Sequence, residues 1–204
     1  MEIYIVRHGE TIWNAKNMLQ GSADIELNEN GRALAGETGV NLETKHFDKI
    51  YSSPLIRAYE TACLIRGHRN IPIIRDERLR ELCFGENEGK NFKELLADET
   101  NPFHHFFDRP DLYRPPEGGE TLEHICERVA GFMKEVIEPQ EKELERIMIV
   151  AHGALNKAIM CHIKQHGTDK FWSGGLQKNC NVIIVNRENG KYQIIDETKI
   201  FYKE

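Results

Sequence analysis

Two short apolar segments of the sequence, residues 2–6 and 146–151, are each followed within two residues by a histidine and then a glycine. Both segments have the length and the β-branched residues of a buried strand, so His8 and His152 follow the points where these strands would end. In open α/β sheets, ligands bind beyond the carboxyl ends of parallel strands. If both segments are central and parallel, the two histidines lie at one edge of the sheet, where the following glycines let the backbone turn close to a ligand.

The rest of the hydrophobic pattern predicts strands that alternate with helices. We expect further strands at residues 49–52, 71–74, 182–186 and 192–197, and helices at residues 28–44, 54–66, 121–145 and 154–165, with Pro139 kinking the third of these helices. Residues 11–28 are expected to form a loop, and Glu188-Asn189-Gly190 a tight turn. This alternation indicates an α/β fold, a three-layer sandwich with a mostly parallel central sheet flanked by helices.

A chain of 204 residues has room for one domain with a substantial core but not for two ordinary domains, so residues 1–204 are expected to form a single domain. Residues 82–119 depart from the alternation, because prolines and glycines interrupt them throughout. We interpret this segment as an insertion over one face of the domain, which forms a lid or contacts a substrate. Its aromatic residues Phe103, Phe106 and Phe107 fit either an apolar lid or one side of a short packed amphipathic helix. Its basic residues are candidate contacts for a charged substrate tail: Lys90, Lys93, Arg109 and Arg114.

The composition excludes several classes of protein. The sequence has no run of about eighteen apolar residues that would span a membrane, and its start lacks the basic and apolar regions of a secretory signal. Five dispersed cysteines without a CxxC pair favour reduced thiols and a cytoplasmic location. A net charge of −6 argues against a nucleic-acid partner held by a broad basic face. The oligomeric state stays open between monomer and homodimer.

Arginines gather where the two histidines are expected. Arg7 directly precedes His8, and Arg57 falls in the first turn of the helix that follows the strand at residues 49–52. The N-terminus of a helix already favours anions, and arginine suits anions with several oxygens such as phosphate. The sequence therefore predicts a compact phosphate site in an acidic protein.

Five blocks of sequence carry a family resemblance. They are Arg7-His8-Gly9-Glu10-Thr11 with Trp13-Asn14, Gln20-Gly21, Asp24, Leu27 and Gly31; Ser52-Ser53-Pro54-Leu55-x-Arg57-Ala58-x-x-Thr61-Ala62; Leu79-x-Glu81-x-x-x-Gly85-x-x-Glu88-Gly89; Pro116-x-Gly118-Gly119-Glu120-Thr121; and Val150-Ala151-His152-Gly153. In this order, and over roughly residues 2–160, they resemble the histidine phosphatase superfamily, the phosphoglycerate mutase-like group. The resemblance implies a phosphoglycerate mutase-like fold.

The resemblance also implies a role for each site residue. His8 would be the nucleophile that becomes phosphorylated, and Glu81 the proton donor and acceptor. Arg7, Arg57 and a protonated His152 would clamp the phosphoryl oxygens. The phosphate pocket and the space near the substrate would include Asn14, Gln20, Gly21 and Gly153. Spacing alone leaves three other carboxylates as alternatives to Glu81, namely Glu10, Glu86 and Glu88, and leaves Asn14 open as a local turn former.

These residues suit phosphoryl transfer through a phosphohistidine. No metal or other cofactor is expected, because the arginines supply the positive charge and the pair His162 and His166 lacks a third ligand. We expect a phosphomonoester hydrolase for a small phosphorylated metabolite. Ala154 favours hydrolysis over transfer, since mutases of this group commonly place a polar Asn after the His-Gly pair. The alternatives are a phosphoglycerate mutase-type phosphotransferase and a non-catalytic phosphate-binding module.

Overall fold

The strands form one mixed sheet at the centre of the protein. In the computed structural model, which describes residues 1–203, its order is β3-β2-β4-β1-β5-β6. The bounds are Glu2–Arg7 (β1), Lys49–Ser52 (β2), Ile73–Arg75 (β3), Arg146–Ala151 (β4), Val182–Glu188 (β5) and Lys191–Lys199 (β6). The strands β1 to β4 are parallel to one another, whereas β5 runs antiparallel to both β1 and β6. The mostly parallel sheet is therefore confirmed.

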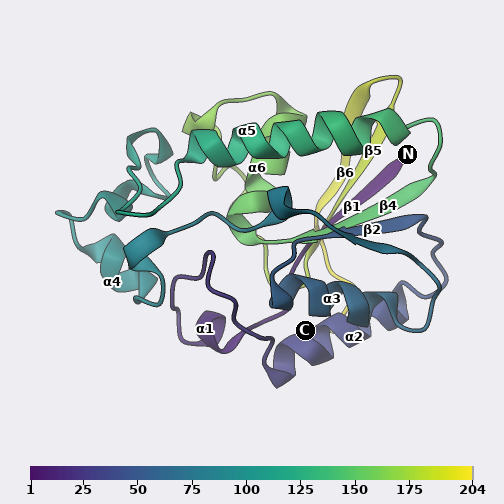
Figure 1. Cartoon of the computed structure of the whole chain (residues 1–204), viewed down its shortest axis with the longest axis horizontal. Helices are drawn as coiled ribbons and strands as arrows, with labels where there is room; N and C mark the ends of the chain where they lie inside the picture. The colour runs from purple at the N-terminus through teal and green to yellow at the C-terminus, as the bar shows by residue number, and fades with distance from the viewer. Residues whose placement is uncertain (204) are drawn as a thin grey trace.

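Helices cover both faces of this sheet, which confirms the three-layer α/β architecture. Figure 1 shows α2 and α3 on one face and α5 and α6 on the other. The helices are Ile12–Ala15 (α1), Glu29–Asn41 (α2), Ile56–Arg66 (α3), Phe92–Ala97 (α4), Leu122–Phe132 (α5) and Gly153–Lys164 (α6). Alternate strand residues enter opposite layers, as the period of two requires: Ile3 and Ile5 pack with α5 and α6, whereas Tyr4 and Val6 pack with α3.

The register of β1 and β4 brings the two histidines to one edge of the sheet. Val6 pairs with Val150, and Arg7 pairs with Ala151. His8 and His152 therefore leave neighbouring strands at the same level, as the sequence predicts. The backbone N–H of His8 still donates to the carbonyl of Ala151 over 2.9 Å, which fixes where β1 ends.

Several predicted boundaries are wrong. The helix expected at residues 121–145 is α-helical only to Phe132 and continues as the π-helical turn Met133–Ile137 and the 3-10 turn Glu138–Gln140. Residues 11–28 contain the short helix α1, because Thr11 and Asn14 form a capping box. The turn at Asn189 and Gly190 is confirmed, and both residues have positive φ as a two-residue hairpin turn requires.

The segment 82–119 starts and ends at one place. Phe84 forms an antiparallel bridge with Gly119, and the N–H of Glu120 donates to the carbonyl of Cys83 over 2.8 Å. Between these ends lie α4 and several 3-10 turns, and Figure 1 shows them at one end of the molecule. Phe103 lies in the 3-10 helix Pro102–His105, and both Phe103 and Phe106 join the main core, so these two rings pack on the domain beside a short 3-10 helix.

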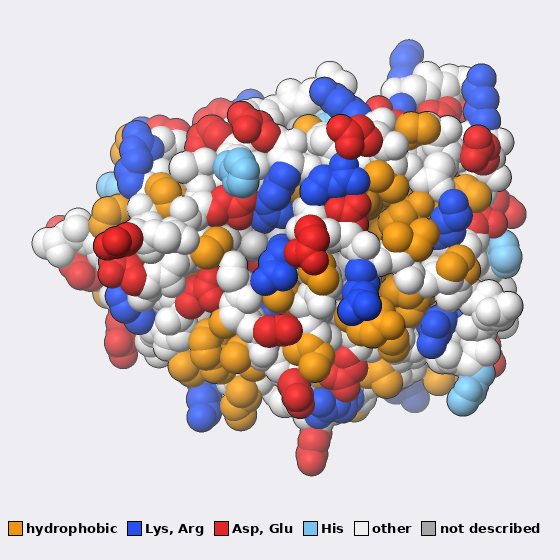
Figure 2. All heavy atoms as spheres, in the orientation of Figure 1, with side chains coloured by type: hydrophobic (Ala, Val, Ile, Leu, Met, Phe, Trp, Pro, Cys, Tyr) orange, Lys and Arg blue, Asp and Glu red, His pale blue; other side chains and the backbone are white. Residues whose placement is uncertain are grey.

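The surface in the view of Figure 2 is mixed in charge. Lysine and arginine side chains alternate there with aspartate and glutamate, and no broad basic area covers this face. Within residues 1–203, every helix is too short or too polar to cross a lipid bilayer. The five cysteines are all free thiols.

We predict that the sheet core between the layers carries much of the stability. Replacing the fully buried Ile149 by alanine leaves a cavity against α5 and α6, so Ile149→Ala should lower the free energy of unfolding by about 2–5 kcal/mol. Ile195 on β6 is 56% exposed, and Ile195→Ala should stay within about 0.5 kcal/mol of the wild type. Urea denaturation measures both, and equal effects of the two changes would contradict the prediction.

Candidate active site

A cavity of about 250 Å³ opens beside the carboxyl ends of β1 and β4. Its lining includes six of the residues predicted from sequence, namely Arg7, His8, Asn14, Gln20, Glu81 and Gly153. Arg57 and His152 do not line its open part, because both are fully buried behind it. The ring of His152 nevertheless lies 5.2 Å from the ring of His8, centroid to centroid. The structure thus brings the predicted residues together in two layers.

His8 is held as a neutral imidazole with one free nitrogen. Its Nδ1 lies 2.7 Å from the carbonyl oxygen of Gly9, and a carbonyl can only accept, so Nδ1 carries the proton and Nε2 keeps its lone pair. Burial lowers the pKa of His8 well below its ordinary value of 6.5, and the charges of Arg57 and Arg7 lower it further. The side chain is therefore a competent nucleophile at neutral pH.

The two arginines are bound by backbone carbonyls rather than by carboxylates. Arg7 donates to the carbonyl of Gln177, and Arg57 donates to the carbonyls of Ala23 and Gly21 over 2.8 and 2.7 Å. Burial lowers the pKa of Arg57 to about 10, so it stays charged at neutral pH. The Nε atom of each arginine is buried and has no partner in the protein. Each guanidinium thus keeps a donor and its full charge for an anion.

His152 differs from the sequence expectation in its charge. Its Nε2 lies 2.8 Å from the hydroxyl oxygen of Ser53, and its Nδ1 is buried without a partner. Burial, followed by the charge of Arg57, lowers the pKa of His152 well below 6.5. The free site therefore favours a neutral His152, and the protonated His152 expected during phosphoryl transfer stays a prediction. If the Ser53 hydroxyl donates to Nε2, the ring proton sits on Nδ1, and the neutral ring can still donate to an anion.

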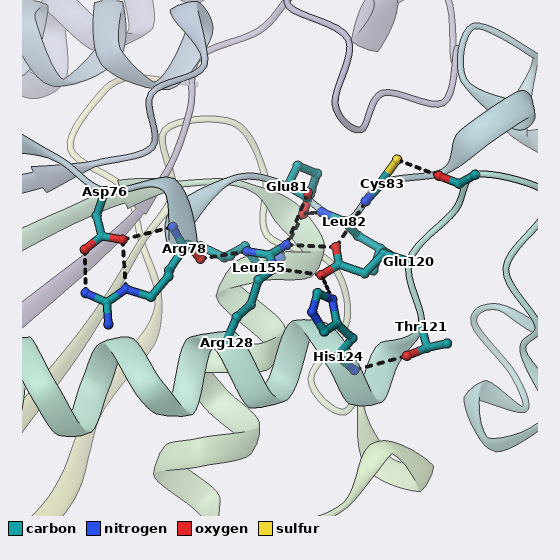
Figure 3. Close-up of polar contacts among 11 residues, drawn as sticks. Asp76, Arg78, Glu81, Leu82, Cys83, Glu120, Thr121, His124, Arg128 and Leu155 are labelled. Atoms are coloured by element: carbon teal, nitrogen blue, oxygen red, sulfur yellow. Dashed lines mark hydrogen bonds and ion pairs between the residues drawn. The ribbon is translucent and has the colours of Figure 1, made fainter.

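Glu81 sits on the N-terminus of helix α6. Its two carboxyl oxygens accept from the backbone N–H groups of Leu82, Leu155 and Ala154 over 2.9, 2.9 and 3.1 Å, and Figure 3 shows the contacts with Leu82 and Leu155. These bonds and the charge of Arg57 favour the carboxylate, but burial outweighs them and raises the pKa of Glu81 above its ordinary 4.5. A buried carboxyl with a raised pKa beside a nucleophile can give and take protons.

The backbone around Glu81 is braced by an ion pair. Arg128 on α5 donates to the carbonyls of Arg78 and Glu81 over 2.7 and 3.3 Å. The same guanidinium forms two bonds with Glu120, at 2.7 and 2.9 Å. Figure 3 shows Arg128 between this carboxylate and the chain that carries Glu81. The fourth sequence block thus contributes Glu120, which supports the catalytic candidate from outside the cavity.

The three alternatives to Glu81 lie elsewhere. Glu10 accepts from Asn28 and Asn30 at the start of α2. Glu86 is exposed, and Glu88 binds the backbone of residues 22–23. None of the three lines the cavity as described for residues 1–203. Geometry therefore selects Glu81, which spacing alone could not do.

A small polar network shapes the wall next to His8. The hydroxyl of Thr11 donates to Oε1 of Gln20 over 2.6 Å, which leaves the buried amide nitrogen of Gln20 without a protein partner. Asn14 completes the capping box of α1 and also lines the cavity, so its local structural role is confirmed, whereas its role in phosphate binding stays a prediction. Gly21 does not line the cavity; its contribution is the carbonyl that binds Arg57.

The sequence analysis missed the loop before β5. Trp172, Leu176 and Asn179 line the cavity, and Asn179 donates to the carbonyl of His8 over 2.9 Å. The sequence does carry one signal for this loop. Trp172 lies two residues before Gly174 and Gly175, in a stretch with no helical or strand period. By contrast, the four basic candidates for a substrate tail lie away from the cavity lining: Lys90, Lys93, Arg109 and Arg114.

The described residues offer no cluster of metal ligands. Among residues 1–203, no three His, Cys, Asp or Glu side chains are arranged to hold a metal ion. His162, half of the spaced histidine pair, instead contacts Glu138 at 2.8 Å.

The fold and the site define a class of α/β proteins in which histidines and arginines meet at the carboxyl end of a mostly parallel sheet. The sequence model of the histidine phosphatase superfamily (branch 1) matches residues 3–198, and the chain belongs to this family of enzymes.

Known relatives fall on both sides of the division between hydrolysis and transfer. The chain is 36% identical over 165 residues to a 2,3-bisphosphoglycerate-dependent phosphoglycerate mutase of Cytophaga hutchinsonii, covering 80% of this chain and 77% of the relative. It is 30% identical over 195 residues to phosphoserine phosphatase 1 of Hydrogenobacter thermophilus, covering 96% and 90%. The solved structure of Bacillus stearothermophilus YhfR superimposes with a TM-score of 0.89 at 34% identity, covering 98% of both chains.

We predict a stability loss in mild acid that comes from the two buried histidines. Because the folded pKa values of His8 and His152 lie below 6.5, the unfolded chain takes up these protons first as the pH falls. Each histidine should then lower the free energy of unfolding by up to about 1.4 kcal/mol per pH unit, from about pH 7 downward.

Denaturant unfolding between about pH 7 and 5 tests this in a His8→Asn, His152→Asn variant, which should show a flatter pH dependence than the wild type. Glu81 acts in the opposite direction, since its folded pKa is raised, but it is present in both proteins. The exposed His68 serves as the control through His68→Asn. A slope that is unchanged in the double variant would refute the assignment.

Proposed function

We propose that this protein is a metal-independent phosphomonoester hydrolase that works through phosphorylated His8. The observation that carries the proposal is the neutral His8, whose Nε2 is free beside two charged arginines that donate to backbone carbonyls. Developing charge on a transferring phosphoryl group needs such fixed positive donors. A non-catalytic binding module would not need a nucleophile held in one tautomer together with a carboxyl of raised pKa.

In the first step, Nε2 of His8 attacks phosphorus, and the bond from phosphorus to the ester oxygen breaks. Glu81 gives its proton to the departing oxygen, so the alcohol leaves neutral. In the second step, Glu81 takes a proton from water, whose oxygen attacks the phosphohistidine. The phosphorus–nitrogen bond breaks, inorganic phosphate leaves, and both side chains return to their starting states. Arg7 and Arg57 stabilise the phosphoryl charge throughout, which is why the proposal assigns no step to a metal.

The far wall of the cavity favours an uncharged leaving group. It is built from apolar side chains, with the ring centroids of Phe107 and Trp172 4.7 Å apart and those of Phe106 and Trp172 5.0 Å apart. Arg7, at the phosphate end, is the one lysine or arginine in the lining as described for residues 1–203. A mutase must also bind a substrate carboxylate in two orientations, and Ala154 offers no side-chain donor for it. We therefore favour hydrolysis of small apolar phosphomonoesters over phosphoglycerate transfer.

The proposal places the enzyme in the cytoplasm, with a small phosphorylated metabolite as its partner. Free thiols at all five cysteines suit a reducing compartment. Phosphoglycerate transfer remains the second candidate, because the Cytophaga hutchinsonii relative is named as a mutase.

We predict that His8→Ala abolishes phosphate release. The test is a panel of phosphomonoesters that includes 1-naphthyl phosphate, phosphoserine and 3-phosphoglycerate, each with and without EDTA. Wild type should release phosphate in both conditions, fastest from the apolar ester, whereas His8→Ala should lose at least about a thousandfold of the activity. The exposed His68 provides the control His68→Ala. Full activity in His8→Ala would sink the mechanism, and isomerised phosphoglycerate with little free phosphate would favour the mutase.

We also predict that Glu81 matters most where the leaving group is a poor one. For an alkyl phosphate, Glu81→Gln should lower kcat/KM by about 10²–10⁴-fold, because the alkoxide then leaves without a proton. The loss should be much smaller for p-nitrophenyl phosphate, whose leaving group needs no proton. Glu86→Gln changes an exposed carboxylate of the same block and should leave both substrates unaffected. Equal losses for both esters in Glu81→Gln would argue against Glu81 as the acid.

A further inference from the structure

The third sequence block contains a second glutamate, Glu88, whose carboxylate binds backbone instead of lining the cavity. Its Oε1 accepts from the N–H groups of Ser22 and Phe84 over 2.7 and 3.1 Å. Its Oε2 accepts from the N–H of Ala23 over 2.7 Å. One side chain thus satisfies three backbone donors, two of them in the loop that follows Gln20.

The same loop provides the carbonyls that bind Arg57. The acceptors are the carbonyls of Gly21 and Ala23, at 2.7 and 2.8 Å, and they bind both terminal nitrogens of the guanidinium. Ala23 therefore donates its N–H to Glu88 and accepts from Arg57 through its carbonyl. The loop is held from the other side as well, because the N–H of Ile56 at the start of α3 donates to Oδ1 of Asp24 over 2.7 Å.

Close packing leaves this loop little freedom. A Cβ added at Gly21 would lie 2.4 Å from the carbonyl oxygen of Leu82 and 2.5 Å from Oε1 of Glu88. Only glycine therefore fits here, directly against the carboxylate that binds the next two residues. Arg57 itself is fully buried, and its Nε has no protein partner, so its orientation depends on these two carbonyls.

We propose that Glu88 is a positioning residue for phosphoryl binding, which acts by holding residues 21–23 so that their carbonyls orient the guanidinium of Arg57. This inference rests on the anion site of the proposed function. A carboxylate is needed because all three partners are donors. A glutamine in the same place would turn its NH₂ group toward at least one backbone N–H, leaving that donor unpaired and pushing the loop away.

A positioning role differs from general support of the fold in one respect. The effect of Glu88 on phosphate binding must depend on the presence of Arg57. Calorimetric titration with inorganic phosphate measures this without turnover, in a cycle of wild type, Glu88→Gln, Arg57→Met and the double variant. Glu88→Gln should weaken phosphate binding by about tenfold, or about 1.4 kcal/mol. In the Arg57→Met background, the same change should have no effect beyond about twofold. An equal weakening in both backgrounds would overturn the proposal.

Two further variants keep the test decisive. Glu86→Gln removes an exposed carboxylate two residues away, with the same change in net charge, and should leave phosphate affinity unchanged. Glu88→Asp keeps the charge but withdraws the oxygens, so it should weaken binding less than Glu88→Gln, and it replaces that variant in the cycle if thermal unfolding shows that Glu88→Gln does not fold. The proposal would be overturned if Glu88→Asp bound phosphate as tightly as the wild type while Glu86→Gln lost phosphate affinity. That result would show that the effect comes from charge alone.

Failure of the role of Glu88 can be distinguished from failure of the proposed function. Wild type that binds no phosphate would refute the anion site and this role together. Phosphate binding with intact coupling between Glu88 and Arg57, but with hydrolysis that survives His8→Ala, would refute only the phosphohistidine mechanism.

Discussion

The site depends on two arginines whose charge is buried but not cancelled. Moving a guanidinium out of water costs free energy unless polar groups replace its hydration. Peptide carbonyls do so here, from Gln177 for Arg7 and from Gly21 and Ala23 for Arg57. Because carbonyls are dipoles and not counter-ions, the positive potential remains. It lowers the pKa values of both histidines and makes the pocket ready for a dianion.

The pKa of Glu81 is shifted in the opposite direction within the same site. The arginines and three backbone donors favour its ionised form, yet burial prevails and its pKa is raised. One environment therefore keeps a histidine unprotonated while it helps a carboxyl retain its proton. In the proposed mechanism, such a divergence separates the roles of nucleophile and acid in a single pocket. The supports of Glu81 are α6, whose N-terminal N–H groups bind the carboxyl, and the pair of Arg128 and Glu120, which binds the carbonyl of the same residue.

The sequence was informative where chemistry is local and silent where it depends on contacts across the fold. The strands that precede His8 and His152 are short apolar runs followed by a His-Gly pair, so their common edge could be predicted on the condition that both strands are central and parallel. Glu81 needed the family resemblance, because nothing in its neighbourhood separates it from Glu88. Trp172 could not be placed, since its loop reaches the cavity only through the return of the chain into β5. The lowered pKa of His152 in the free site could not be predicted for a similar reason, because it is caused mainly by burial, which no motif reports.

The closed base of the segment 82–119 has a consequence for how such enzymes diversify. Its ends meet at the bridge between Phe84 and Gly119, just beyond the braced Glu81. The entropic cost of closing a loop grows only slowly with its length, so exposed stretches between these two points can change in length at little entropic cost, provided that Phe103 and Phe106 still fill the core. Phe106 and Phe107, which form part of the cavity wall, belong to the segment 82–119, whereas His8, Arg57 and Glu81 lie outside it. Substrate range and catalytic chemistry can therefore evolve as separate traits.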